Sequence, residues 1–197
     1  MVKLGDEDMK IGVLALQGAF IEHIHILQAL GIETVEVRLP KDLDSIDAII
    51  IPGGESTTIG KLALMYNLIN PLRHFSADKP VWGTCAGMVL MAKEIGRDQT
   101  LLGVMDIVVE RNAFGRQVDS FETNLYVNVL KDWKSRPFPC VFIRSPRLVK
   151  TRGKAKEIAR LEDGTAVAAR EGKLLVTSFH PELTEDIRFH QYFMSLV

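Results

Sequence analysis

Cysteine, net charge and long apolar runs are all scarce in this chain, and each absence narrows the class of protein. Only two cysteines, Cys85 and Cys140, occur among 197 residues, and no secretory signal is recognisable. We therefore expect reduced thiols and a cytoplasmic protein rather than a disulfide framework. No apolar run approaches the length of a membrane span, so no membrane partner is expected. The formal net charge of −1 offers no basic surface for nucleic acid.

Apolar runs alternate with helical patterns through the first half of the chain, which is typical of an α/β protein with a parallel sheet. The predicted strands span residues 10–16, 34–39, 48–51 and 81–82, and the predicted helices span 19–30, 57–70 and 86–95. The run AIII at 48–51 is apolar without alternation, as in a central strand that is covered on both faces. These strands end in loops at the carboxyl edge of the sheet, where open α/β folds place their sites.

After Gly103 the pattern changes to short strands with turn residues and no helix between them. They are predicted at 104–109, 124–130, 140–143, 155–160, 165–169 and 174–179, and a final helix, capped by Thr184, is predicted at 184–197. We therefore expect one α/β domain with a mostly parallel central sheet, flanking helices and an antiparallel extension. It would span residues 10–197, after a polar, flexible leader at residues 1–9.

The stretch GTCAG places Cys85 at the turn between a predicted strand and a predicted helix. The spacing of Gly83, Cys85 and Gly87 is the thiol version of the nucleophile elbow, in which flanking glycines permit a tight turn. A helix N-terminus favours the thiolate, and the N–H of Ala86 is left free to donate to a developing oxyanion. The same pattern also fits a small buried cysteine, so the motif alone leaves both interpretations open.

A second stretch, HPE, follows the predicted strand at 174–179. If the chain stays extended there, His180 and Glu182 leave on the same face, and Pro181 favours the extended conformation in the residue before it. A thiol, a base and a carboxylate that orients the base are the parts that cysteine catalysis requires. Each of these residues alone is more commonly structural, but together they favour a triad of Cys85, His180 and Glu182.

The loop PGGESTT, at residues 52–58, follows the third predicted strand. It contains neither G-K-[ST] nor G-x-G-x-x-G, which argues against a nucleotide-binding loop. Ser56 or Thr57 would cap the following helix, and the paired glycines expose backbone N–H groups. A plain turn with a helix cap is the alternative, but the two adjacent glycines favour a second oxyanion donor.

These motifs resemble those of the class I, triad-type glutamine amidotransferase family, whose domain has a flavodoxin-like core. The elbow GTCAG and the HPE stretch are shared widely within that superfamily. The motifs LQGAFIEH (16–23), ERNAFGRQVDSFE (110–122), FIRSP (142–146) and SFHPELTED (178–186) are more specific, and they are similar to the glutaminase subunits of pyridoxal 5′-phosphate synthases. The resemblance runs from about Lys10 to the C-terminus.

The resemblance implies hydrolysis of L-glutamine to L-glutamate and ammonia through a cysteine thioester, without a cofactor, and delivery of the ammonia to a synthase subunit. Cys85 would be the nucleophile, His180 the acid and base, and Glu182 the residue that orients it. The N–H groups of Gly54 and Ala86 would hold the oxyanion. The family's glutamine-contacting positions correspond here to Gly53, Gly54, Glu55, Arg111, Ile143 and Arg144. A guanidinium suits the α-carboxylate of glutamine, but the sequence leaves open which arginine binds it.

Other functions remain open on the sequence alone. A glutaminase could serve another synthase, such as those of the imidazole glycerol phosphate or guanylate pathways, although the stretch RNAFGRQVDSFE argues against it. A thiol sensor or chaperone on a similar core would not need Glu182, and a pure interaction module would form no thioester. No metal site is expected, since His23 and His25 face different sides of a predicted helix. His190 is expected to be a surface or packing residue, and Cys140 a core residue.

Overall fold

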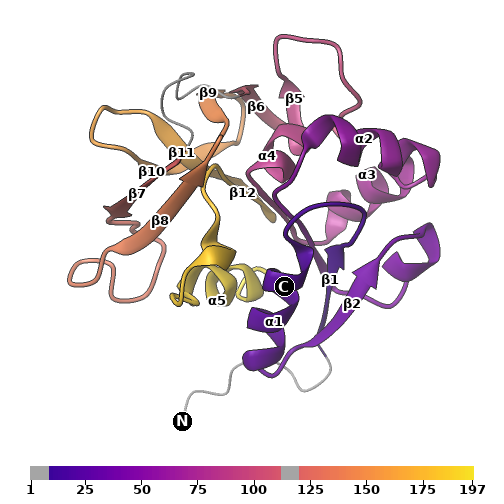
Figure 1. Ribbon diagram of the computed structural model, residues 1–197, viewed down its shortest axis with the longest axis horizontal. Helices are drawn as coiled ribbons and strands as arrows, with labels where there is room; N and C mark the ends of the chain where they lie inside the picture. Colours follow the sequence, from indigo (N-terminus) through magenta and orange to yellow (C-terminus); the bar gives the residue numbers. More distant parts are fainter. Residues whose placement is uncertain (1–8, 112–119) are drawn as a thin grey trace.

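A ten-stranded sheet forms the centre of the molecule (Figure 1). The computed structural model describes residues 9–111 and 120–197, so the expected leader lies outside the described residues except for Met9, which packs against the core. The strands are β1 (Lys10–Leu14), β2 (Glu33–Val37), β3 (Ala48–Ile51), β4 (Val81–Thr84), β5 (Ala92–Glu94), β6 (Met105–Glu110), β7 (Ser120–Leu125), β8 (Phe138–Ile143), β9 (Arg147–Thr151), β10 (Lys156–Arg160), β11 (Ala166–Glu171) and β12 (Leu174–Thr177). Their order is β2-β1-β3-β4-β12-β11-β9-β6-β5, with β10 also paired to β11.

The sheet has a parallel part and an antiparallel part, which confirms the expected α/β fold class. Strands β2, β1, β3, β4 and β12 pair in parallel, whereas β9, β10 and β11 pair antiparallel with their neighbours. Strand β12 lies directly beside β4, in a register that sets Thr177 opposite Thr84. The two segments that carry the HPE and GTCAG motifs therefore end side by side at the carboxyl edge of the sheet.

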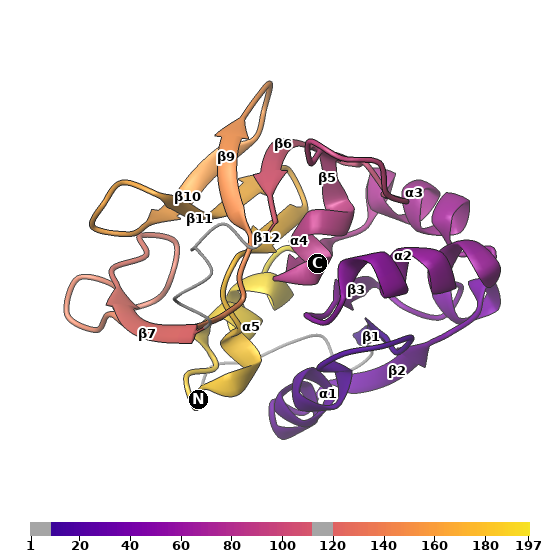
Figure 2. The same ribbon diagram turned by 45° about the horizontal axis from the view of Figure 1, so that its top comes forward.

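Helices cover both faces of the sheet (Figures 1 and 2). They are α1 (Phe20–Ala29), α2 (Ser56–Met65), α3 (Ile69–Asp78), α4 (Ala86–Met91) and α5 (Arg188–Met194), with two short 3₁₀ helices, η1 (Pro40–Leu43) and η2 (Pro181–Leu183). Residues of α2, α3 and α4 share one buried core, and residues of α1 and α5 share the other. Along β3, Ile49 and Ile51 enter the first core, whereas Ala48 and Ile50 enter the second. All four are fully buried, which confirms the expected central strand.

The helix predicted at 57–70 is in fact two helices. Helix α2 ends at Met65, and the chain then turns at Asn67, whose φ of 58° lies in the left-handed region that asparagine tolerates. Helix α3 begins at Ile69, so all but its first two residues lie beyond the predicted helix. Its sequence is polar and contains Pro71, but this proline lies in the first turn, where its missing N–H breaks no helical hydrogen bond.

Several other boundaries differ from the predicted ones. Helix α4 stops at Met91 rather than at 95, because Ala92 is extended and begins β5, which pairs with β6. Strand β9 has no predicted counterpart, since only Leu148 in it is fully buried and its sequence shows little apolar alternation. Strands β7 and β8 form a separate two-stranded antiparallel sheet, and residues 126–130, which the sequence predicts as strand, lie beyond its end.

The last helix, predicted from residue 184, begins only at Arg188. Its N-cap is Ile187, so the prediction that Thr184 caps it is wrong. The Thr184 hydroxyl instead donates to the carbonyl of Pro181 and accepts from the N–H of Asp186. These bonds fix the short turn between η2 and α5, a sequence-local arrangement that competes with helix formation.

Arg188 is a buried charge that ties α5 to the loop before β8. Its guanidinium donates to both carboxylate oxygens of Asp186 and to the carbonyls of Lys131, Arg136 and Pro137. The side chains of Arg188 and Asp186 are only 5% and 4% exposed. Although burial acts in the opposite direction, the hydrogen bonds from Arg188 lower the pKa of the Asp186 carboxyl. The loop is therefore held by a fully engaged cation.

We expect Arg188→Met to destabilise the fold strongly, because it takes the buried partner from the Asp186 carboxylate, which keeps only the more exposed Arg136 as an ion-pair partner, and removes the donor to three carbonyls. Removal of one partner of a buried ion pair costs about 3 kcal/mol, which corresponds to a fall in Tm of roughly 6–12 °C for a domain of this size. Calorimetry at neutral pH measures the change. Arg152→Met is the matched control, since its ion pair with Glu94 is 42% and 52% exposed, and such pairs contribute at most about 1 kcal/mol. Equal losses in the two variants would contradict this role.

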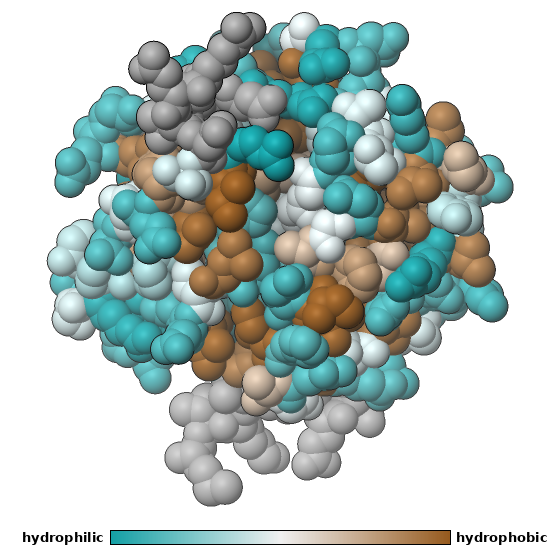
Figure 3. Space-filling view, viewed as in Figure 1, coloured by the Kyte–Doolittle hydropathy of each residue, from teal (hydrophilic) through white to brown (hydrophobic). Residues whose placement is uncertain are grey.

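The surface in the orientation of Figure 1 mixes hydrophilic and hydrophobic residues, and the hydrophobic ones occur in separate patches (Figure 3). Leu64 and Met65, at the end of α2, are among the most exposed large hydrophobic side chains. No helix in residues 9–111 and 120–197 is long and apolar enough to cross a bilayer.

Candidate active site

Cys85 lies at the turn between β4 and α4, with φ of 48° and ψ of −103°. Residues other than glycine rarely adopt this backbone conformation, and backbone strain of this kind is concentrated at functional sites. Its N–H donates to the carbonyl of Thr177, which ties the turn to β12. A Cβ on Gly83 would lie 2.5 Å from the backbone of Gly87, and a Cβ on Gly87 would lie 2.1 Å from the carbonyl oxygen of Ile51. Both glycines are therefore required by close packing, as the elbow pattern predicts.

His180 and Glu182 are in contact, but not for the reason that the sequence suggests. The chain is not extended through them, because residues 181–183 form the 3₁₀ helix η2. The turn nevertheless brings His180 Nδ1 to 2.7 Å from Glu182 Oε1. Both side chains are largely buried, and Glu182 is the more enclosed of the two. The expected contact is present, and the expected backbone geometry is wrong.

The surroundings of His180 favour its protonated form. Burial alone would lower the pKa of the imidazole, but hydrogen bonds to Cys85 and Glu182 and their charges outweigh it and raise the pKa to about 10. His180 therefore holds a proton at neutral pH. A protonated imidazole that touches a thiol on one side and a carboxylate on the other can donate a proton to a leaving group and later take one from water.

The PGGESTT loop passes directly over these groups. A Cβ on Gly53 would lie 2.5 Å from His180 Cε1 and 3.5 Å from Cys85 Cβ, so only glycine fits between the loop and the imidazole. A Cβ on Gly54 would lie 2.6 Å from Gln17 Oε1. The backbone of this loop therefore passes close to both Cys85 and His180.

Glu55 has a structural role in addition to the one expected from the resemblance. Its carboxylate caps α2, accepting from the N–H groups of Thr57 and Thr58, so the expected cap by Ser56 or Thr57 is wrong. Although burial acts in the opposite direction, these hydrogen bonds lower the pKa of Glu55 to about 2. Glu55 Oε1 also lies 3.0 Å from the guanidinium of Arg111. The carboxylate is therefore ionised and held in place beside a cation.

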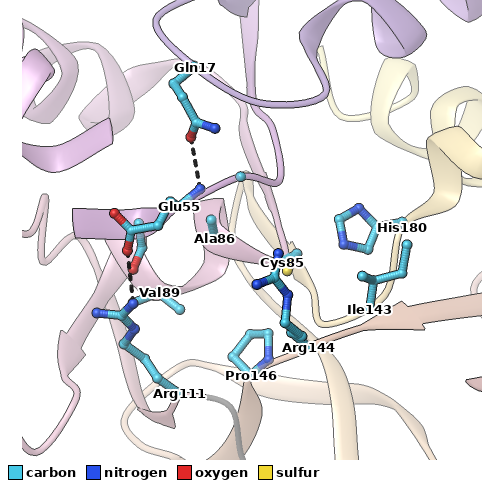
Figure 4. A pocket seen from close by; sticks show the side chains of 12 residues that line it. Gln17, Glu55, Cys85, Ala86, Val89, Arg111, Ile143, Arg144, Pro146 and His180 are labelled. Atoms are coloured by element: carbon cyan, nitrogen blue, oxygen red, sulfur yellow. Dashed lines mark hydrogen bonds and ion pairs between the residues drawn. The ribbon is translucent and has the colours of Figure 1, made fainter. Parts of the chain in front are cut away.

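These residues surround one pocket of about 300 Å³ (Figure 4). The pocket is lined by Gln17, Gly54, Glu55, Ser56, Cys85, Ala86, Val89, Arg111, Ile143, Arg144, Pro146 and His180. Of the candidate site residues from the sequence, Gly53 and Glu182 do not line it, and both lie against His180 instead. The side chains of Cys85 and His180 lie together at one side, and the Glu55–Arg111 pair lies at the other (Figure 4).

Three residues near the site have no assigned role in the sequence analysis. Gln17 accepts the N–H of Glu55 at 2.8 Å and so fixes the glycine loop from a segment far away in the chain (Figure 4). His23 and His190 are completely buried behind Glu182 and contact each other. Gln17 and His23 belong to the LQGAFIEH motif, which is the feature of the sequence that could have pointed to them.

His25 is exposed whereas His23 is buried, so these two histidines face different sides of α1, as predicted. Cys140 lies in the core, where burial raises the pKa of its thiol.

The site combines a cysteine on a strained turn with an imidazole–carboxylate pair, at the edge of an α/β sheet and beneath a glycine-rich loop. This combination is typical of sites that transfer acyl groups through a cysteine. The chain belongs to the SNO glutamine amidotransferase family, which it matches over residues 13–197. It is 56% identical to "Pyridoxal 5'-phosphate synthase subunit PdxT" of Herpetosiphon aurantiacus, over 95% of this chain and 100% of that protein. It is 53% identical to the protein of the same name from Moorella thermoacetica, over 96% of this chain and 100% of that one.

The fold has a close match among solved structures. A crystal structure described as a glutamine amidotransferase superposes with a TM-score of 0.88 at 48% sequence identity, covering 94% of this chain and 97% of that chain. The sheet order and the flanking helices are therefore those of a glutamine amidotransferase.

Proposed function

We propose that this chain hydrolyses L-glutamine to L-glutamate and ammonia and is the glutaminase subunit of a pyridoxal 5′-phosphate synthase. The observation that carries the proposal is the contact of His180 with both Cys85 and Glu182 at the edge of a pocket that also holds Arg111 and Arg144. The names of its relatives support the choice of synthase. Residues 10–197 would act as one glutaminase domain.

In the first step, the Cys85 thiolate attacks the side-chain amide carbon of glutamine. The carbonyl oxygen becomes an oxyanion, which the N–H groups of Gly54 and Ala86 would bind. His180 carries the proton that the amide nitrogen needs to depart as ammonia, consistent with its raised pKa. The C–N bond breaks, and a glutamyl thioester remains on Cys85.

In the second step, the now neutral His180 takes a proton from water as the water oxygen attacks the thioester carbon. The C–S bond breaks, glutamate leaves and Cys85 returns as the thiolate beside the imidazolium. Glu182 accepts from His180 Nδ1 throughout and keeps the other ring nitrogen directed at the reacting atoms. This chemistry requires a reduced Cys85, which the cytoplasm maintains, and it requires no cofactor.

We assign the α-carboxylate of glutamine to Arg144 rather than to Arg111. The Arg111 guanidinium is already engaged by Glu55, Thr57 and Gln99. Arg144 follows β8 with a φ of 43° and lines the same pocket, and among the described residues it has no ion pair or hydrogen bond to its side chain. The ionised Glu55 is placed to meet the α-ammonium group, with Ile143 lining the same pocket, while Gly53 lies behind it against His180.

Arg144→Ala should therefore raise KM for glutamine more than it lowers kcat. Loss of a charged hydrogen bond to the α-carboxylate predicts about a 10- to 100-fold rise in KM, with kcat within roughly threefold. Steady-state glutamate release measures both constants. Arg147→Ala is the matched control, because Arg147 is a near neighbour that pairs with Glu110 on the surface. A fall in kcat with KM unchanged would overturn the assignment.

The partner follows from the chemistry of the product. Ammonia is protonated in bulk water and then loses its nucleophilicity, so a synthase must receive it through a sheltered route. We expect glutamate release to rise when the synthase subunit of a pyridoxal 5′-phosphate synthase is added to the purified chain. If that synthase gave no stimulation and a guanylate or imidazole glycerol phosphate synthase did, the partner would be that other synthase. No glutamate release under any of these conditions would favour a thiol sensor instead.

A further inference from the structure

Glu182 has one carboxylate oxygen whose partner the triad does not explain. Oε1 accepts from His180, but Oε2 is buried and has no hydrogen bond of good geometry in the described part of the chain. A carboxylate oxygen that is buried without a donor is costly. Within residues 9–111 and 120–197, the only other basic side chain within ion-pair distance of Glu182 is His23, whose Nε2 lies 3.4 Å from Oε2.

His23 is enclosed on every side. It projects from α1 and is completely buried, with the ring of Trp82 at 5.6 Å in an edge-on arrangement. Its Nδ1 lies 2.9 Å from Nε2 of His190 on α5, and its Nε2 lies 3.4 Å from the Thr84 hydroxyl as well as from Glu182. One side of the ring thus faces a second histidine, and the other faces the carboxylate.

The proton positions on the two rings follow by elimination. Burial lowers the pKa of both His23 and His190, so each ring is neutral and carries one N–H. Nδ1 of His190 is buried and has no partner among the residues that the structure describes, and an unpaired acceptor there costs less than an unpaired N–H. His190 therefore carries its proton on Nε2 and donates it to His23 Nδ1. His23 must then carry its proton on Nε2, which lies 3.4 Å from both the Thr84 hydroxyl and Glu182 Oε2.

The opposite assignment is unfavourable at both ends. It would bury an unpaired N–H on His190, and it would set the Nε2 lone pair of His23 beside an ionised carboxylate oxygen, with the Thr84 hydroxyl at 3.4 Å as the donor to it. The contacts among these side chains therefore select one tautomer for each ring.

We propose that His23, in the tautomer that His190 selects, is a positioning residue for Glu182. Its Nε2–H holds Oε2, so that Oε1 stays aligned with Nδ1 of His180 and the proton of His180 stays in place for ammonia release. The assignment rests on the proposed glutaminase function for its catalytic consequence, but not for the tautomers. It extends the series of contacting polar side chains from Cys85 through His180 and Glu182 to two neutral histidines on α1 and α5.

The tautomers can be measured directly on the intact chain. In ¹⁵N-histidine-labelled protein, the nitrogen chemical shifts report which ring nitrogen carries the proton, and we expect Nε2–H for both His23 and His190. A proton on Nδ1 of His23 would overturn the proposal even in an active enzyme. Conversely, absence of glutamate release from the wild-type chain, both alone and with the synthase, would contradict the proposed function and leave the tautomer result intact.

A pair of variants tests the positioning role. His23→Gln keeps an N–H near Oε2, whereas His23→Leu removes it. We expect His23→Leu to lower kcat by about 10- to 100-fold with KM within roughly twofold, and His23→Gln to restore most of that loss. His25→Leu, on the exposed side of α1, is the control. Leu and Gln variants that are folded and equally impaired would contradict positioning through an N–H.

The titration of His180 gives a readout that a merely structural role would not change. The titratable groups that face His180 are Cys85 at the start of α4, Glu182 in η2 and His23 on α1, while His190 on α5 faces only His23 of these. In His23→Leu the carboxylate is less firmly held, so the NMR titration midpoint of His180 should move to lower pH. If His23→Leu does not fold, His190→Leu against His190→Gln makes the same comparison one residue further out. An unshifted midpoint in the folded Leu variant would contradict the proposal.

Discussion

Cys85→Ala is expected to abolish glutamate release while leaving the fold and the binding of the synthase intact. The thiol supplies the only bond between enzyme and substrate in the proposed mechanism, and loss of a nucleophile of this kind lowers kcat by about 10⁴-fold or more. The side chain is small and lies at the pocket, so its removal creates little cavity in the core. Glutamate release measures the loss, and size-exclusion chromatography with the synthase measures binding.

Cys140→Ala serves as the control for that variant. Cys140 is the other free cysteine of the described chain, and it lies on β8 with its side chain in the core. Its replacement should cost some stability and leave the rate of glutamate release within a fewfold of wild type. Substantial turnover by Cys85→Ala would mean that water attacks glutamine directly, and the thioester mechanism would have to be abandoned.

Glu182→Gln is expected to lower kcat by roughly 10³-fold, because the carboxylate that orients and supports the imidazolium is lost. In the wild-type chain the contacts with Cys85 and Glu182 raise the pKa of His180 to about 10, despite burial. A raised pKa keeps the proton on His180 through neutral pH and releases it as the pH approaches that value. The rate of ammonia release should therefore fall on the alkaline side, and the variant should show this fall at lower pH.

The pH dependence of kcat/KM and an NMR titration of the His180 ring test this expectation together. Both midpoints should move downward in Glu182→Gln. Glu185→Gln, which removes an exposed carboxylate three residues along the chain, should change neither. An alkaline midpoint that stays near the wild-type value in Glu182→Gln would show that Glu182 does not support the charge on His180.

Much of the fold follows from local patterns in the sequence. Strand β3 is uniformly apolar because both of its faces are covered, and Gly83 and Gly87, on either side of Cys85, mark a turn that leaves no room for a Cβ at their positions. Helix α3 and strand β9 cannot be predicted from such local patterns. Their apolar faces are narrow, and they depend on contacts with neighbouring elements.

The candidate site likewise contains residues that the sequence identifies and residues that only the structure brings together. Cys85, His180 and Glu182 are identifiable because two of them are close in sequence and the third lies on a recognisable turn. His23 and His190 are 167 positions apart, and only the packing of α1 and α5 against the sheet brings them together. In the turn at Pro181, the N–H groups of Leu183 and Thr184 donate to the carbonyls of His180 and Pro181, and these bonds close a 3₁₀ turn, so the sequence predicts the contact without its geometry.

Labelling with a chloroketone analogue of L-glutamine tests most directly whether the Cys85 pocket is a glutamine site. The analogue places an electrophilic carbon where the side-chain amide would lie, and peptide mass spectrometry identifies the residue that it alkylates. We predict a single adduct on Cys85, slowed by L-glutamine and absent from Cys85→Ala. Labelling at Cys140, or labelling of Cys85 that L-glutamine does not slow, would contradict a glutamine site at this thiol.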